Sequence, residues 1–266
     1  MSIDFTIEKY TDLCETIAFS GYMPMTVRAY LETKDLPSRL VIVRHDVDAT
    51  PRNEPKIALV ESDFGIRATY YFRYKASIFK PDVMREISAM GHEIGYHYET
   101  LDRAKGDSER ATEIFKRELA AFREVADVRT ISMHGNPLTK WDNRNVWRNR
   151  DFRDFGILGE AYLSFSDIVY LSDTGRTWSP AYKVKDILPS DKEGDQRHQL
   201  THKVYSTDDV IELIETGQHN RLYLLTHAGR WGTSTSGWVV SLFQDTAVNI
   251  VKRVLALRAR ATAKTE

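Results

Sequence analysis

The sequence predicts an α/β fold, a distorted and incomplete (β/α)7-type barrel with mostly parallel strands. Short runs rich in β-branched and aromatic residues alternate repeatedly with longer segments of helical periodicity. This alternation is typical of a parallel sheet with helices packed outside it. The sequence contains no Gly-x-Gly-x-x-Gly or Walker motif, which would mark a nucleotide-binding sheet. A doubly wound open sheet is the alternative that the alternation itself leaves open.

The composition is that of an ordinary globular protein. The chain has 266 residues, 42% of them hydrophobic and 28% charged, which is enough for one large α/β domain over residues 1–266. The net charge of −1 gives no overall attraction to nucleic acid or to a membrane surface. Cys14 is the single cysteine, so an internal disulfide is excluded. The first residues lack a signal-peptide pattern and no apolar run reaches the ~20 residues of a membrane span. We therefore expect a cytoplasmic protein; its oligomeric state is not predicted.

The first part of the chain is expected to be helical. Residues 1–35 are predicted to form a helical extension, because apolar side chains recur at helical spacing between Ile7 and Ile17. Residues 40–43 form an aliphatic run that predicts a strand buried on both faces. A helix follows from about residue 51, where a proline suits its first turn, to the glycine at 65.

The later elements repeat this pattern. Strands are predicted at 68–73, 92–97, 130–133 and 221–227, and helices at 81–91, 108–125, 206–215 and 238–257. Ser206 and Asp209 have the spacing of a capping box at the start of one helix. Between residues 138 and 200 the regularity fails, and we expect an irregular insertion over the functional site.

Metal-ligand types stand at the ends of four predicted strands: Asp46 with Asp48, His97, His134 and His227. In a parallel barrel these ends meet on one face. One carboxylate with two imidazoles is a common hydrolytic zinc set that leaves a position open for water. The remaining carboxylate and histidine could then accept and supply protons. The plainer alternative is a helix cap with a surface salt bridge to Arg44 and ordinary hydrogen-bonded histidines.

These residues resemble the polysaccharide deacetylases, the NodB-homology enzymes of carbohydrate esterase family four. Residues 46–49 match the Asp-Val-Asp-Ala form of their first motif, and residues 91–97 reproduce Gly-His-Glu-Ile-Gly-x-His. Residues 224–227 resemble the late motif, a strand ending in Leu-x-His. The matches keep the family's order and span most of the chain.

The resemblance implies a function and a set of roles. Asp46 would be the catalytic base, Asp48 and His97 metal ligands, and His227 the general acid. The cofactor would be a divalent metal, zinc in the first place, with cobalt or another transition metal as alternatives. The implied reaction is hydrolysis of an amide, the N-deacylation of a sugar, sugar nucleotide or glycan precursor.

Two departures from the family's pattern change the expected site. Leu101 stands where the family has its second histidine ligand, and a leucine cannot coordinate a metal. His134 is the expected replacement and Glu99 the alternative, and loss of the metal is a third outcome. The family's arginine motif, which orients the base, is also absent. Arg176 is expected to pair with Asp46 instead, although a plain turn explains its segment equally well.

The substrate contacts are expected from the second half of the chain. They comprise Trp178, Trp231, Arg230 and Asp173. Tryptophan faces suit sugar rings, but they also pack loops against a core. Two other functions remain open: a carbohydrate-binding barrel that has lost its metal and its activity, and a hydrolase of a small amide outside carbohydrates.

Overall fold

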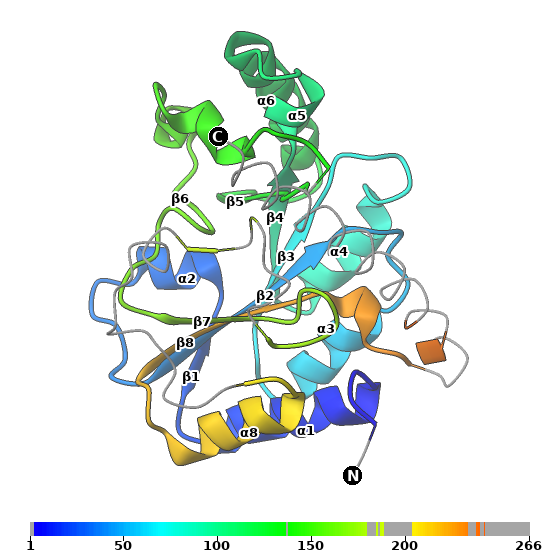
Figure 1. The fold of residues 1–266 in the computed structure, drawn as a ribbon, viewed down its shortest axis with the longest axis vertical. Coiled ribbons are helices and arrows are strands. Elements are labelled where there is room, and N and C mark those ends of the chain that lie inside the picture. Colours follow the sequence, from blue (N-terminus) through cyan, green and yellow to red (C-terminus); the bar gives the residue numbers. More distant parts are fainter. Residues whose placement is uncertain are drawn as a thin grey trace, which may run out of the picture.

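A parallel eight-stranded sheet forms the centre of the molecule (Figure 1). The computed structural model describes residues 3–136, 138–179, 185, 187–188, 204–233, 238–239 and 242. The strands are β1 (Met23–Met25), β2 (Leu40–Val47), β3 (Thr69–Phe72), β4 (Glu93–Tyr98), β5 (Thr130–Met133), β6 (Gly159–Glu160), β7 (Val169–Ser172) and β8 (Arg221–Thr226). Their order is β6-β5-β4-β3-β2-β8-β7, with β1 paired to β2.

The strand order distinguishes the two fold classes that the sequence left open. All the strand pairs are parallel. From β2 to β6, and then from β7 through β8 back to β2, the strands follow the order of the chain around a ring. A doubly wound sheet would instead reverse its order at a switch point. The fold is therefore an incomplete α/β barrel, open between β6 and β7, and the predicted fold class is confirmed.

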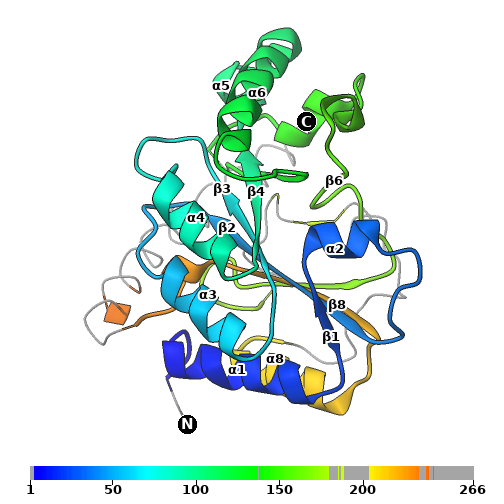
Figure 2. The same cartoon turned by 180° about the vertical axis from the view of Figure 1, so that it is seen from behind.

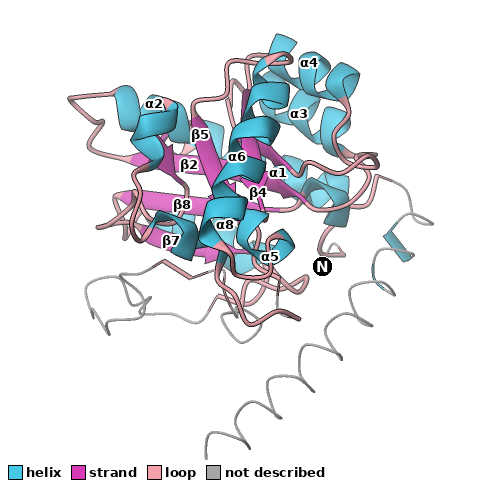
Figure 3. Ribbon diagram, turned by 90° about the horizontal axis from the view of Figure 1, so that it is seen from above, coloured by secondary structure: helices cyan, strands magenta, loops and turns pink. Residues whose placement is uncertain are grey.

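Helices cover the outside of this sheet (Figure 2 and Figure 3). They are α1 (Ile7–Phe19), α2 (Val27–Glu32), α3 (Glu54–Asp63), α4 (Pro81–Ala89), α5 (Thr100–Arg103), α6 (Ser108–Arg123) and α8 (Thr207–Thr216), with the 3-10 turns η1 (Asn143–Trp147), η2 (Phe152–Phe155) and η5 (Ala228–Arg230). Helices α1 and α8 pack side by side (Figure 1). The capping box of Ser206 and Asp209 is present at the start of α8, as predicted. Within the described parts of the chain, no helix is long and apolar enough to cross a membrane.

Two elements differ from the sequence-based expectations. The predicted helical extension also contains the short strand β1, with a proline at 24. A strand at the edge of a sheet tolerates proline, because its missing N–H is not needed there. Strand β2 runs on to Val47, and all eight of its residues are buried. The predicted helix at 238–257, apart from residues 238, 239 and 242, and the last part of the insertion at 138–200 lie outside the described residues.

A buried polar network joins α1 and α3 to the sheet. The Glu61 carboxylate accepts hydrogen bonds from the hydroxyls of Tyr10 (2.6 Å) and Tyr70 (2.7 Å). It also lies 2.8 Å from Nε2 of His45, whose Nδ1 is 2.6 Å from the Thr226 hydroxyl. Burial alone would raise the pKa of Glu61, but the charge of His45 and the hydrogen bonds lower it below its ordinary value. The network thereby connects five elements, α1, α3, β2, β3 and β8, around one ionised carboxylate.

The chain segment before α1 is bound to the segment after β8. Thr6 and Gly232 form an isolated parallel bridge. The N–H of Ile7 donates to the Gly232 carbonyl, and the N–H of Gly232 donates to the Phe5 carbonyl, both at 2.9 Å. The Phe5 ring also packs 5.0 Å from the ring of Trp231. This clamp holds the loop that begins at the end of β8.

Candidate metal centre

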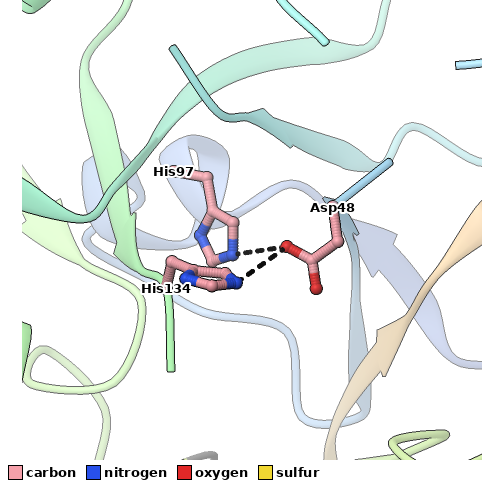
Figure 4. A group of neighbouring side chains, drawn as sticks. All are labelled: Asp48, His97 and His134. Atoms are coloured by element: carbon pink, nitrogen blue, oxygen red, sulfur yellow. Dashed lines mark ion pairs between the residues drawn. The ribbon is translucent and has the colours of Figure 1, made fainter. Parts of the chain in front are cut away.

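Three ligand-type side chains converge where β2, β4 and β5 end (Figure 4). Oδ1 of Asp48 lies 3.3 Å from Nε2 of His97 and 3.6 Å from Nε2 of His134. One ligand atom from each residue lies within 4.8 Å of the other two. Parallel strand ends place these side chains on one face although they are distant in the sequence. The group could hold a metal ion, with the three side chains expected from the sequence.

The His97 ring is oriented by a backbone carbonyl. Its Nδ1 lies 3.0 Å from the carbonyl oxygen of Ser132, on the neighbouring strand. Because a carbonyl oxygen can only accept, a ring hydrogen is on Nδ1, which leaves Nε2 as the atom that can bind a metal. Nε2 is the atom that faces Asp48. Metal-binding histidines are commonly held in this way.

His134 is held in the neutral form that binds metals. Burial lowers its pKa from 6.5 to about 3, so the imidazole carries no charge at neutral pH. The backbone N–H of His134 donates to the Tyr98 carbonyl at 2.8 Å, and the backbone carbonyl of His134 accepts from the side chain of Asn143 at 2.9 Å. Glu99, the alternative ligand, lies beside Nδ1, away from the Nε2 that faces Asp48, and is not part of the group.

The site shows the unsatisfied polar atoms that a cation would need. Oδ1 of Asp48 is shielded from solvent and has no hydrogen-bond partner among the described residues. Burial alone would raise the pKa of Asp48, but the close contact with the His97 side chain and the charge of that imidazole hold that pKa well below its ordinary value. A shielded carboxylate oxygen without a hydrogen bond is costly unless a cation compensates it. One carboxylate oxygen and two imidazole nitrogens fit a divalent transition metal.

Position 101, where the resemblance places a histidine ligand, serves the core instead. The Leu101 side chain is buried, and its N–H donates to the side-chain oxygen of Asn143 at 3.0 Å. The same Asn143 side chain holds the His134 carbonyl. The helix that would carry the usual second ligand is thus tied to the loop that carries its replacement.

Asp46 is paired with Arg44 rather than with Arg176. Nη1 of Arg44 lies 3.7 Å from Oδ1 of Asp46 and donates to the Ser132 hydroxyl at 2.7 Å. The Arg176 guanidinium instead lies 5.4 Å from the ring centre of Phe5, so the predicted pair is corrected. The sequence indicates the pair of Arg44 and Asp46, because residues i and i+2 of a strand face the same side. From the sequence we expect this pair only as a surface salt bridge, whereas Arg44 is fully buried.

Asp173 holds His227. Its Oδ1 lies 2.6 Å from Nδ1 of His227, and its Oδ2 accepts the His227 N–H at 3.0 Å. Arg230 donates to Oδ1 at 3.0 Å. Burial would raise the pKa of Asp173, but His227 and Arg230 lower it to about 2. Nε2 of His227 then lies 3.7 Å from Oδ2 of Asp48, facing the metal group.

Most of the predicted substrate contacts are corrected. Asp173 is fully buried against His227, and Arg230 is bound to Asp173. Trp178 is 1% exposed and donates to the Thr207 hydroxyl. Trp231 is 0% exposed and packs against α1. The two tryptophans belong to the core, where neither ring face is open to a sugar.

The comparisons with known proteins give a structural likeness only. No protein-family model matches the chain, and no curated protein matches it. Among solved structures, a candidate polysaccharide deacetylase from Mycobacterium smegmatis is similar at a TM-score of 0.43 and 13% identity, over 90% of this chain and 96% of that one. A mutant of a pseudoenzyme of carbohydrate esterase family four, with restored enzymatic activity, is similar at a TM-score of 0.38 and 12% identity, over 82% and 69%. Both likenesses concern the fold and come at low sequence identity.

Proposed function

We propose that this chain is a metal-dependent amide hydrolase that removes an N-acyl group from a sugar, a sugar nucleotide or a glycan precursor. The observation that carries the proposal is the grouping of Asp48, His97 and His134 with Asp46 and His227 on one face of the barrel. The ligand set favours zinc, with cobalt as a substitute. When bound, the ion would supply a Lewis acid that polarises the acyl carbonyl and activates water.

Asp46 is the proposed general base. Its carboxylate is 4% exposed, and its Oδ2 lies 3.7 Å from Nε2 of His97, at the edge of the metal group. It can therefore accept a proton from a water molecule that attacks the acyl carbon. Arg44, which donates a hydrogen bond to Ser132, pairs with this carboxylate and keeps it oriented.

His227 is the proposed general acid. The carboxylate of Asp173 keeps a hydrogen on Nδ1 and fixes the ring, so that Nε2 faces the site. Protonated at Nε2, the ring can deliver that proton to the nitrogen of the departing amine. Asp46 and His227 reach the site from neighbouring strands, β2 and β8.

The carbohydrate substrate rests on the motif resemblance. A cavity of about 400 Å³ beside Glu99 is lined by Tyr74, Lys75, Asp102, Arg103, Asn136 and Thr139, and its lining includes no member of the metal group. The lining offers one aromatic ring and several hydrogen-bonding groups. Such a mixture suits a hydroxyl-rich ring more than an apolar one.

Product release from acylated sugars tests the proposal. The protein is loaded with stoichiometric zinc or cobalt and incubated with a panel of N-acetylated and N-formylated sugars and sugar nucleotides. We expect release of acetate or formate from at least one member, and none with metal-free protein or with Asp46→Asn. If the fully metal-loaded protein released neither acetate nor formate from any member of the panel, the proposed hydrolase function would be contradicted.

One observation favours a second candidate, a carbohydrate-binding barrel without activity. Leu101 occupies the position of a ligand in the resembled family and is packed in the core. This candidate requires glycan binding without turnover and without a tightly bound metal. Elemental analysis of freshly purified protein separates the two, because the hydrolase retains a stoichiometric metal.

A further inference from the structure

Glu99 and Arg73 lie directly behind the candidate metal centre. Arg73 follows β3 and Glu99 follows β4, and their side chains are 9% and 7% exposed. Nη2 of Arg73 donates to Oε2 of Glu99 at 2.5 Å, and the same oxygen lies 3.4 Å from Nδ1 of His134. A carboxylate oxygen can only accept, so this contact favours the tautomer with the hydrogen on Nδ1. Nε2 then keeps its lone pair on the side of Asp48.

Arg73 also contacts a second member of the metal group. Its Nη1 donates to the backbone carbonyl of Asp48 at 3.3 Å and lies 4.0 Å from Oδ1 of that residue. A planar guanidinium presents its donors in a fixed fork. One buried side chain therefore fixes the position of Asp48 and, through Glu99, the position of His134.

The two histidines of the group differ in how their Nδ1 atoms are held. For His97 a backbone carbonyl, that of Ser132, accepts the hydrogen. The backbone of His134 is fixed by Tyr98 and Asn143, but these contacts leave the rotation of its ring undetermined. Within the described residues, Nδ1 of His134 is buried and has no hydrogen bond of standard geometry. The carboxylate of Glu99 is the acceptor beside it.

We propose that Glu99 is a positioning residue for His134, and that Arg73 holds Glu99 and Asp48 in register. Glu99 accepts the Nδ1 hydrogen and turns Nε2 toward the ion. His134 lies on a loop, whereas the resemblance places the ligand that it replaces on the helix at position 101. The contact with Glu99 fixes the ring orientation that the loop alone does not fix. The inference rests on the metal site of the proposed function but not on its reaction.

Zinc affinity measures this role without any substrate. Metal-stripped protein is titrated with zinc against a chromophoric chelator, and cobalt absorption reports the ligand geometry. Removing a carboxylate that orients a metal-bound histidine typically costs 10–100-fold in affinity. We expect Glu99→Ala to raise the zinc Kd by about this factor. Glu99→Gln should have a smaller effect, because its amide oxygen still accepts from Nδ1.

Glu118→Gln is the matched control. Glu118 is as buried as Glu99 and is likewise paired with an arginine, Arg103, but it contacts no member of the metal group. Its zinc Kd should equal that of the unmodified protein. The thermal midpoint of each metal-free variant shows whether it folds. If Glu99→Ala does not fold, the zinc Kd of Glu99→Gln, which keeps the size of the side chain, still tests the proposal.

Two results would overturn the proposal. One is an unchanged zinc Kd and cobalt spectrum in both Glu99 variants. The other is complete loss of zinc in both of them, equal to that of His134→Ala, which would make Glu99 a ligand. Weaker zinc binding in Glu99→Ala supports the positioning role even if no acylated sugar is hydrolysed, so the inference and the proposed function fail separately.

Discussion

Asp173 and His227 are joined twice, once through the imidazole at 2.6 Å and once through the backbone N–H of His227 at 3.0 Å. The double contact fixes both the ring and the chain that carries it. A carboxylate can accept both hydrogens, whereas an amide presents one acceptor and one donor. The identity of residue 173 therefore decides which nitrogen of the neutral His227 ring carries the hydrogen.

Asp173→Asn should lower kcat by about 10²–10⁴-fold, the range attributed to general acid–base catalysis. The amide nitrogen would donate to Nδ1 and favour the opposite tautomer of His227. His227→Ala should lower kcat to a similar extent. Both variants should keep stoichiometric zinc, measured by elemental analysis, because neither residue belongs to the group of Asp48. Loss of zinc in either variant would contradict this division of roles.

His134→Ala should lose the metal as completely as His97→Ala. Each change leaves two protein ligands, which are too few to bind zinc tightly. Elemental analysis of the variants, purified in parallel with His227→Ala as the control that retains zinc, checks this expectation. Full occupancy in His134→Ala would remove His134 from the ligand set.

Arg44→Met should impair both stability and turnover. It leaves the buried carboxylate of Asp46 without its cation, and breaking a buried ion pair on one side costs about 3–5 kcal/mol. Urea denaturation measures the stability, and acyl release measures the turnover. Arg176→Ala is the comparison: the structure separates Arg176 from the base, so its turnover should match that of the unmodified protein. A loss of turnover in Arg176→Ala but not in Arg44→Met would support the pair of Arg176 and Asp46 that the sequence predicts.

Glu61 should make the stability depend on pH. Its folded-state pKa is lowered below the ordinary 4.5. The stabilisation is therefore present above the unfolded pKa and is lost as the pH falls through the folded one. We expect Glu61→Gln to be less stable than the unmodified protein at neutral pH, and the gap in thermal midpoint to narrow below about pH 4. A gap that stays constant down to pH 3 would mean that the ionised form contributes nothing.

Tyr10→Phe tests the same network from α1. The change removes one hydroxyl that donates to Glu61, and a hydrogen bond to a charged group contributes about 1.5–3 kcal/mol. Urea denaturation should show a loss of this size. Tyr30→Phe, on the neighbouring helix, is the matched control, since Tyr30 contacts the Phe165 ring and is not part of the network.

The sequence predicted the elements that local patterns determine. Strands β2 to β5 and β8 have the expected residue types, and His134 was placed beside His97 because consecutive parallel strands pair. The role of Asp173 could not be foreseen, because its partner His227 lies on another strand and no local pattern relates the two. The same limit explains the tryptophans. Trp178 and Trp231 lie in loops, and only the three-dimensional packing shows that these loops are covered.

Arg44 illustrates a different limit. Its spacing from Asp46 made the pair visible, but the sequence did not show that the strand is buried along its whole length. An arginine is rarely fully buried, so the surface interpretation was the natural one. The aromatic rings around its guanidinium come from distant parts of the chain: Tyr71 on β3, Tyr223 on β8, and Tyr162, at 4.3 Å, from a segment without regular periodicity.

The bridge between Thr6 and Gly232 sets an order of events for a chain made from its amino end. Ribosomes add about 5–20 residues per second, so Thr6 emerges on the order of ten seconds or more before its partner. Until β8 is made, one edge of β2 lacks its neighbour, and Asp48 is present without His227. No truncated or prematurely released chain that ends before β8 can hold the complete set of reacting groups. Hydrolytic competence would arise only when nearly all of the described chain has been made.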